Sequence, residues 1–261
     1  MKILITGARS GIGYKTGLTL AKLGHEVILT VHTKEQEETL NRKLEKLKKL
    51  NLNISCFKLD IKDESDRKKI TNLDIDCLIN NAAVGYSDSI LEIDLKKLKE
   101  NFEVNVFSTI RLSQIYAADL FANKRKGKII FISSIIGIIP VPFLGSYSAT
   151  KASLIALATS LRKELKLITN DIEVKLIEPG IYNTGFNDYV FFNKKESKSK
   201  YFDLESITLK QKKLFRLIGS DNLNSIVYKI VKSVLDNSNK FIYRAPFFQV
   251  IITKFYMLFF R

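Results

Sequence analysis

The chain has 261 residues, of which 46% are hydrophobic and 26% are charged, and we expect residues 1–261 to form a single domain with a sizeable core. This composition excludes a disordered, collagen-like or disulfide-stapled chain. The 42 lysines and arginines outnumber the 27 acidic residues and give a net charge of +15, which favours acidic partners, anionic ligands or an anionic membrane surface.

The chain has few side chains suited to disulfides or to metal binding. The two cysteines, Cys56 and Cys77, predict no disulfide framework and fit a reducing compartment. His25 and His32 are the two histidines and do not form a spaced helical pair, so we expect no metal site. The sequence shows no secretory signal, which favours a cytoplasmic location, and no recognition motif that would indicate a nucleic-acid partner.

Apolar runs alternate with longer amphipathic stretches along the chain, a pattern typical of βαβ units. The runs predict seven strands, at residues 2–6, 26–31, 53–59, 77–80, 128–133, 173–177 and 240–243. A leucine stripe over residues 40–50 and the stretches 98–123 and 146–168 predict helices. The expected fold is therefore α/β, a doubly wound, mostly parallel seven-stranded sheet with helices on both faces.

A glycine-rich turn follows the first predicted strand and opens a helix. It reads Thr6-Gly7-Ala8-Arg9-Ser10-Gly11-Ile12-Gly13. Glycines at this spacing let backbone amides approach a pyrophosphate at the helix N-terminus. The spacing also suits a tight strand-to-helix turn without a ligand, but its position directly after an apolar strand favours dinucleotide binding.

The end of the second predicted strand bears on the choice of dinucleotide. Val31 stands where an acid would bind the adenosine ribose hydroxyls. Arg9, His32 and Lys34 are cations that could approach a 2′-phosphate, although they also suit a solvated surface. The sequence therefore predicts NADP(H) in preference to NAD(H).

Tyr147 and Lys151 lie four residues apart in a predicted helix, which places a phenol and an ammonium on one face. We expect the charge of Lys151, assisted by an oxidised nicotinamide ring, to lower the pKa of the phenol, about 10 in water, so that Tyr147 exchanges a proton with a carbonyl or alcohol oxygen. Ser134, at the end of a predicted strand, is placed to bind the same oxygen. The pair alone also suits a lysine that packs over an aromatic ring.

Together these residues resemble the short-chain dehydrogenase/reductase family, in the single-domain group with a Thr-Gly-x-x-x-Gly-x-Gly turn and a Tyr-x-x-x-Lys active site. The resemblance covers nearly the whole chain. Its further motifs are Asp60-Ile61, Asn80-Asn81-Ala82-Ala83, Asn105 and Pro179-Gly180-Ile181-Tyr182-Asn183-Thr184. It implies an NAD(P)-dependent oxidoreductase that transfers a hydride between the nicotinamide and a carbonyl or secondary alcohol.

The resemblance also implies roles for individual residues. Ser134, Tyr147 and Lys151 would be catalytic, and Asn105 would fix a water that links Lys151 to solvent, although Asn105 also suits a helix cap or kink. Asp60 would contact the adenine and Thr184 the nicotinamide carboxamide, while Asn80 would support the sheet. The residues expected at the cofactor are Gly7, Arg9, Ser10, Gly11, Ile12, Gly13, His32, Asp60, Ile61, Asn81, Ala82, Tyr147, Lys151, Pro179, Gly180, Ile181 and Thr184.

Two positions depart from the family pattern. Ala83 stands where the family usually has glycine, which adds a Cβ near the cofactor groove. Ser10 stands where NADP-preferring members often carry a basic residue, and the arginine is one position earlier. Homodimers and homotetramers are common in the family, often through the helices that carry Asn105 and Tyr147, so we expect one of these states.

Residues 186–220 interrupt the strand and helix alternation and form a candidate substrate lid. Apolar residues beside the motifs and in the lid favour a hydrophobic substrate, although they also suit an ordinary core. They are Ile136, Phe143, Ile181, Phe186, Tyr189, Phe191 and Phe192.

Residues 241–261 form an aromatic and basic segment that is too short between charges to span a bilayer. It is suited to packing on an anionic membrane surface, on the sheet of its own chain, or in a homo-oligomer interface.

The alternative to an enzymatic function is a non-enzymatic NADP(H)-binding scaffold or a membrane-associated redox-sensing module.

Overall fold

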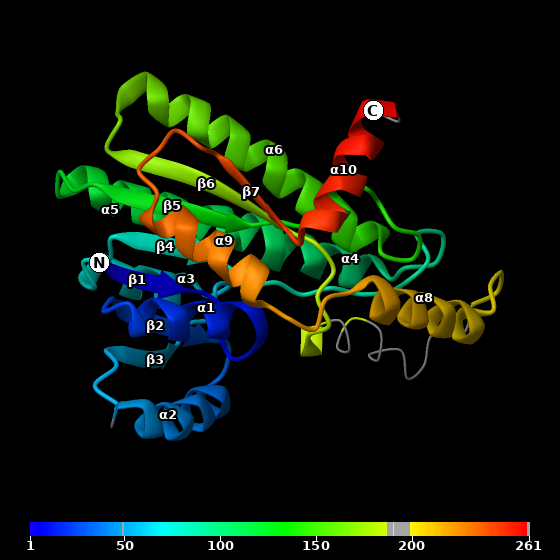
Figure 1. Cartoon of the computed structure of the whole chain (residues 1–261), viewed down its shortest axis with the longest axis horizontal. Coiled ribbons are helices and arrows are strands. Elements are labelled where there is room, and N and C mark those ends of the chain that lie inside the picture. Colours follow the sequence, from blue (N-terminus) through cyan, green and yellow to red (C-terminus); the bar gives the residue numbers. More distant parts are fainter. Residues whose placement is uncertain (49, 187–189, 191–198, 260–261) are drawn as a thin grey trace.

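The computed structural model describes residues 1–48, 50–186, 190 and 199–259, and within them a seven-stranded sheet runs through the centre (Figure 1). The strands are β1 (Lys2–Ile5), β2 (Glu26–Val31), β3 (Ile54–Lys58), β4 (Cys77–Asn80), β5 (Gly127–Ile132), β6 (Ile172–Pro179) and β7 (Ile242–Ala245). All neighbours pair in parallel, in the order β3-β2-β1-β4-β5-β6-β7. The predicted doubly wound α/β fold is confirmed.

Helices cover both faces of the sheet (Figure 1). They are α1 (Gly11–Lys22), α2 (Lys34–Lys48), α3 (Glu64–Lys68), α4 (Leu95–Phe102), α5 (Thr109–Ala122), α6 (Gly145–Ile168), α8 (Leu204–Ile218), α9 (Asn224–Leu235) and α10 (Phe247–Phe259). Short helical turns occur at Lys69–Asn72 and Ile135–Gly137, and a π-helical segment, Glu103–Ser108, joins α4 to α5.

Alternate residues of each strand enter two separate cores. Ile3 and Ile5 of β1 pack with α1, α2 and α9, whereas Leu4 packs on the opposite face with α5 and α6. Side chains alternate across a strand, so a sheet covered on both faces needs apolar residues at nearly every position. This requirement explains why the central strands read as continuous apolar runs rather than as alternating ones.

Several predicted elements differ from the observed ones at their ends, and two of these differences have a local cause. The last strand begins at Ile242 rather than at residue 240, because the Lys240 N–H donates to Ser238 Oγ within a turn. The helix predicted over residues 98–123 begins earlier, at Leu95, where the Asp94 side chain accepts a hydrogen bond from the Lys96 N–H. The π-helical segment then interrupts it, so the single predicted helix is three successive segments.

The predicted segment 241–261 has two parts: β7 lies in the sheet with Tyr243 buried, as the own-sheet alternative has it, whereas the aromatic residues after β7 do not pack on the sheet. After β7 it forms α10, which extends away from the sheet (Figure 1). The polar residues Gln249 and Thr253 are buried, whereas the large apolar residues are exposed: Phe247, Phe248, Ile251, Ile252, Phe255, Leu258 and Phe259. The prediction that this stretch packs on the sheet of its own chain is therefore wrong for these residues. Among the described helices, none is both long and apolar enough to cross a membrane.

Candidate active site

A cavity of about 670 Å³ lies at the carboxyl ends of the central strands. In a parallel sheet these ends meet at one edge, and ligands bind where the strand order reverses, here between β1 and β4. Every residue predicted to bind the cofactor lines this cavity: Gly7, Arg9, Ser10, Gly11, Ile12, Gly13, His32, Asp60, Ile61, Asn81, Ala82, Tyr147, Lys151, Pro179, Gly180, Ile181 and Thr184.

The turn after β1 is fastened to the turn after β4. Thr6 Oγ1 accepts hydrogen bonds from the backbone N–H groups of Asn81 and Ala82, at 2.9 and 3.0 Å. The Asn81 side-chain amide donates to the carbonyl oxygens of Thr6 and Gly7, at 2.8 and 3.1 Å. Gly7 has a φ of +60°, and a Cβ there would lie 2.6 Å from Ala82 Cα. A glycine is therefore required at this position for both reasons.

The N-terminus of α1 opens into the cavity. Gly11, Ile12 and Gly13 line it, and the N-cap residue Ser10 makes no side-chain capping bond. The first turn of α1 contains no acidic residue. Because the first N–H groups of a helix have no intrahelical partner and the helix dipole is positive there, this end is suited to a phosphate group.

Cations gather at the end of the cavity near β2 and β3. His32 Nε2 lies 3.4 Å from Asp60 Oδ2, and Arg9 lines the wall without an ion pair to another described residue. Lys62, which the sequence analysis did not single out although it follows Asp60-Ile61, also lines the cavity. Lys34 does not, because it pairs at 2.8 Å with Glu37 on the exposed face of α2, so its predicted approach to a 2′-phosphate is wrong for this structure.

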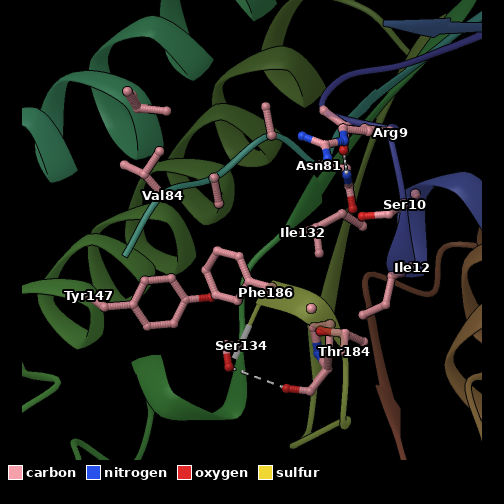
Figure 2. Close-up of a pocket in the computed structure, with 18 of the residues that line it drawn as sticks. Arg9, Ser10, Ile12, Asn81, Val84, Ile132, Ser134, Tyr147, Thr184 and Phe186 are labelled. Atoms are coloured by element: carbon pink, nitrogen blue, oxygen red, sulfur yellow. Dashed lines mark hydrogen bonds between the residues drawn. The ribbon is translucent and has the colours of Figure 1, made fainter. Parts of the chain in front are cut away.

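Tyr147, Lys151 and Ser134 meet at the other end. Figure 2 shows Tyr147 and Ser134 extending into the cavity from α6 and from the end of β5. Lys151 Nζ lies 5.5 Å from the centre of the Tyr147 ring and donates to the Ile132 carbonyl at 2.8 Å. Ser134 Oγ donates a long, 3.4 Å bond to the Pro179 carbonyl. The Tyr147 hydroxyl makes no hydrogen bond to any described residue, so it remains available to a ligand.

Burial sets the ionisation of this pair. It raises the pKa of Tyr147 well above its usual value, and it lowers the pKa of Lys151 to about 7. Both shifts favour the neutral form, because a charge is poorly solvated in the protein interior. The prediction that Lys151 and an oxidised nicotinamide ring together lower the pKa of Tyr147 concerns the complex with the cofactor, and it stays a prediction.

Asn105 lies outside the cavity lining. It is fully buried in the π-helical segment. Its amide nitrogen donates to the Val84 carbonyl at 2.8 Å and to Thr150 Oγ1 at 3.0 Å, and its oxygen accepts from the Val84 N–H at 2.8 Å. Both amide hydrogens are thus used within the protein, where the side chain holds the loop after β4. The role of Asn105 in fixing a water that links Lys151 to solvent stays a prediction.

Apolar residues form the wall around Tyr147. Phe186 lies with its ring centre 5.6 Å from that of Tyr147, and Ile136, Ile181 and Phe215 also line the cavity. Phe215 comes from α8, inside the predicted lid, and the sequence analysis passed over it because the surrounding lysines dominate that stretch. The predicted pocket residues Tyr189, Phe191 and Phe192 lie outside the described residues.

Phe143 does not line the cavity, contrary to its prediction as a pocket residue. Its ring packs edge-on against Phe202 with 5.3 Å between centres. Sequence proximity to a motif was the only signal for Phe143, and the backbone at this residue turns into the left-handed region, with a φ of +63°.

An α/β fold with a glycine turn and a Tyr-x-x-x-Lys helix at one cavity defines a dinucleotide-binding type of oxidoreductase. The short chain dehydrogenase family model matches residues 1–195. The chain therefore belongs to the short chain dehydrogenase family.

Curated relatives agree with this assignment. The chain is 34% identical over 185 residues to a very-long-chain 3-oxoacyl-CoA reductase of Lodderomyces elongisporus, a match that covers 66% of this chain and 52% of the relative. It is 32% identical over 204 residues to a probable short-chain type dehydrogenase/reductase of Helicobacter pylori, which covers 76% of this chain and 71% of the relative. The match thus spans about half the length of the very-long-chain 3-oxoacyl-CoA reductases.

Solved structures share the fold. A short chain dehydrogenase/reductase from Burkholderia phymatum in complex with NAD has a TM-score of 0.83 and 17% identity, and the match covers 97% of this chain and 91% of that chain. A Burkholderia cenocepacia short chain dehydrogenase in complex with NADP has a TM-score of 0.70 and 20% identity, with coverages of 100% and 97%.

Lys151→Met is expected to stabilise the protein at low pH. Burial lowers the pKa of Lys151 from 10.5 to about 7, so the folded state below pH 7 carries a poorly solvated charge. The unfolded chain binds this proton up to about pH 10.5, so the destabilisation is fully present below pH 7 and disappears as the pH rises toward 10.5. Urea unfolding should show a higher free energy of unfolding for Lys151→Met at pH 6, and a smaller gain at pH 9.5.

Lys163→Met, on the exposed surface of the same helix, is the matched control and should show no comparable gain at either pH. A gain for Lys151→Met that does not decrease between pH 6 and pH 9.5 would contradict the explanation by charge burial.

Proposed function

We propose that this protein uses a nicotinamide dinucleotide to interconvert a carbonyl compound and the corresponding secondary alcohol. The observation that carries the proposal is one continuous cavity with the glycine turn at one end and Tyr147, Ser134 and Lys151 at the other. A scaffold has no chemical need for a buried amine beside a phenol whose hydroxyl has no hydrogen-bond partner among the described residues. Membership of an oxidoreductase family further disfavours the non-enzymatic alternative.

The residues present fit such a dinucleotide. The glycine turn and the N-terminus of α1 would hold the pyrophosphate, with Asp60 and Ile61 at the adenosine end and Thr184 toward the nicotinamide. Gly11 and Thr184 face each other, since a Cβ on Gly11 would lie 3.9 Å from Thr184 Cβ. When bound, the nicotinamide supplies or accepts the hydride.

The side chains at the other end supply binding and a proton. Ser134 donates its hydroxyl to the substrate oxygen once its long bond to Pro179 is released. Tyr147, whose pKa is raised by burial, is protonated and transfers this proton to the same oxygen as the carbonyl carbon is reduced. Lys151 in its ammonium form stabilises the resulting phenolate. In the direction of oxidation the proton moves back to Tyr147.

NADP(H) is the proposed dinucleotide. Arg9 and Lys62 line the cavity at its β2–β3 end, and β2 ends in Val31, where an acid would repel a 2′-phosphate. His32 lies in the same wall, beside Asp60. The Ser10 departure from the family pattern does not remove positive charge from this end, because Arg9 itself lines the cavity.

The proposed substrate carries an apolar chain. Phe186, Phe215, Ile136, Ile181 and Val84 line the cavity, so the substrate region beside Tyr147 is largely apolar. The curated relatives named as very-long-chain 3-oxoacyl-CoA reductases support a carbonyl on a long acyl chain. Positive charge on the chain, +15 overall, also suits an anionic carrier group on such a substrate.

The apolar face of α10 is proposed to rest on an anionic membrane surface. Its residues Phe247, Phe248 and Phe255 are 79%, 72% and 61% exposed. Residues 194–261 contain fourteen lysines and arginines against five acidic residues, so the aromatic face belongs to a strongly basic region. Apolar side chains beside cations are typical of helices that lie in the headgroup region of anionic bilayers.

A homodimer or homotetramer through α5 and α6 is proposed as the assembly. Phe107, Phe121 and Leu157 are exposed on the π-helical segment, α5 and α6, and large exposed apolar residues are typical of interaction surfaces when they lie together. The resembling family often assembles through these helices.

Tyr147→Phe is expected to retain NADPH binding and to lower turnover about a thousandfold, because the ring remains and the transferable proton is lost. NADPH oxidation is measured with a panel from short polar ketones to long-chain 3-oxo thioesters, and the wild type should prefer the long chains. The exposed Tyr228→Phe is the control. Near-normal turnover by Tyr147→Phe would refute its role, and reaction with small polar carbonyls alone would reject the apolar substrate.

Arg9→Gln is expected to weaken NADPH binding about tenfold and to leave NADH binding nearly unchanged, because only NADPH has a 2′-phosphate to pair with the guanidinium. Fluorescence titration gives both Kd values. Lys34→Gln, whose lysine pairs with Glu37 away from the cavity, should change neither. Tighter binding of NADH than of NADPH by the wild type would overturn the preference.

Replacing Phe248, Ile252 and Phe255 with serine is expected to abolish flotation with phosphatidylglycerol vesicles, because the apolar face that enters the headgroup region is lost. Wild-type protein should float with these vesicles and less with phosphatidylcholine. Leu23, Leu50 and Leu167, exposed elsewhere, are replaced with serine as the matched control. Equal flotation of both triple variants, or a vesicle-free dimer that only the α10 variant dissociates, would contradict membrane docking.

A further inference from the structure

Gln249 connects three segments that are distant in the sequence. It lies on the inner side of α10 and is only 6% exposed. Its side-chain oxygen accepts a hydrogen bond from the Ile181 N–H at 2.6 Å. Its nitrogen donates to the Ile181 carbonyl at 3.3 Å and to the Ile218 carbonyl at 2.9 Å. One side chain thus joins α10 to the loop after β6 and to the last residue of α8.

The segment held by Gln249 is a wall of the cavity. Pro179, Gly180, Ile181, Thr184 and Phe186 all line it, whereas Gln249 itself does not. The pairing of the Gln249 amide with both backbone groups of Ile181 resembles the pairing of a neighbouring strand. Among the described residues, Gln249 is the only partner of the Ile181 N–H, so its loss would leave a partly buried donor without a partner.

The lack of a side chain at Gly180 allows Gln249 to come this close to Ile181. A Cβ on Gly180 would lie 2.1 Å from the Gln249 side-chain oxygen and 2.8 Å from Pro246 Cδ. Any other residue at 180 would push the amide away from Ile181. The glycine of the Pro179-Gly180 motif therefore has a packing role toward α10 as well as a place in the cavity wall.

The hydrogen bond from Gln249 to Ile218 reaches the end of α8, whose residue Phe215 we call the roof residue of the cavity. Ile218 is the last residue of α8, and the last carbonyl groups of a helix have no intrahelical partner. Phe215, one turn earlier in α8, lines the cavity. Backbone bonds also join these segments, since the Ser220 N–H donates to the Ile181 carbonyl and the Asn183 N–H donates to the Ser220 carbonyl, each at 3.0 Å. Gln249 adds a connection from α10 to both of them.

We propose that Gln249 is a positioning residue that sets the geometry of the cofactor wall and the substrate roof from outside the cavity. The cofactor part of this inference rests on the proposed function. It follows that α10 has two roles on opposite sides: its inner side organises the site, and its outer side carries the exposed aromatic residues.

Gln249→Leu, of similar size and without hydrogen bonds, is compared with Gln249→Glu, which keeps an acceptor for the Ile181 N–H but loses both donors. Thr253→Val is the matched control, because Thr253 is buried on the same side of α10 and its hydroxyl donates within the helix, to the Gln249 carbonyl at 2.8 Å. Hydrogen exchange of peptides covering 180–186 and 214–220 is measured with the thermal midpoint and the Kd for NADPH.

Gln249→Leu should speed exchange in both peptides and raise the Kd for NADPH about tenfold, the effect of losing one to two hydrogen bonds in the wall. Thr253→Val should change neither. In Gln249→Glu, hydrogen exchange in the 180–186 peptide should be slower than in Gln249→Leu, because an acceptor for the Ile181 N–H remains. Exchange in the 214–220 peptide should be faster than in the wild type. If Gln249→Leu does not fold, Gln249→Glu alone tests the positioning role.

A folded Gln249→Leu with wild-type exchange in both peptides, or a Thr253→Val that matches it in every measurement, would overturn the proposal in favour of simple helix packing. The exchange measurement needs neither cofactor nor substrate. If the wild type binds no dinucleotide, the proposed function fails while the exchange data still test the positioning role.

Discussion

The contact between the turns after β1 and β4 is the constraint on which the cavity depends. These two strands are neighbours in the sheet, yet the helices that follow them lie on opposite faces, so the chain separates there and leaves a crevice. Thr6 keeps the crevice narrow by accepting two amides of the opposite turn. Gly7 allows that approach because there is no space for a Cβ against Ala82.

Burial of the Lys151 amine at the far end of the crevice lowers the stability of the fold and also shifts the pKa of this amine. Lys151 is 2% exposed and is held by the Ile132 carbonyl, which compensates part of the cost of burying an amine. The same burial lowers its pKa to about 7, so its charge depends on small changes in the surroundings near neutral pH. A buried amine of this kind lowers the stability of the folded chain, and strongly shifted pKa values are typical of functional sites.

The sequence predicted those features that lie within one turn or one strand. The glycine turn and the spacing of Tyr147 and Lys151 are local, and the glycines, Tyr147 and Lys151 all line the cavity, as do the further cofactor residues that the family resemblance implied. Lys34, expected from the end of the second strand, does not line it. Long-range contacts were not predictable from such patterns. The amide of Asn105 is used by Val84, 21 residues away, and Gln249 meets Ile181 across 68 residues. The contribution of burial, which raises the pKa of Tyr147, was not predictable for a related reason, since burial depends on the whole packed site.

Helix α10 inverts the usual amphipathic arrangement. A surface helix normally turns its apolar side inward, whereas here two hydrogen-bonded polar residues face the protein and seven large apolar residues face outward. Burying Gln249 is tolerable because both of its amide atoms have partners. The exposed residues gain no such compensation in water, so the free energy of the chain falls when that face is covered. Whatever covers it also restrains the helix that holds Ile181, which connects the outer surface of the protein with the wall of its cavity.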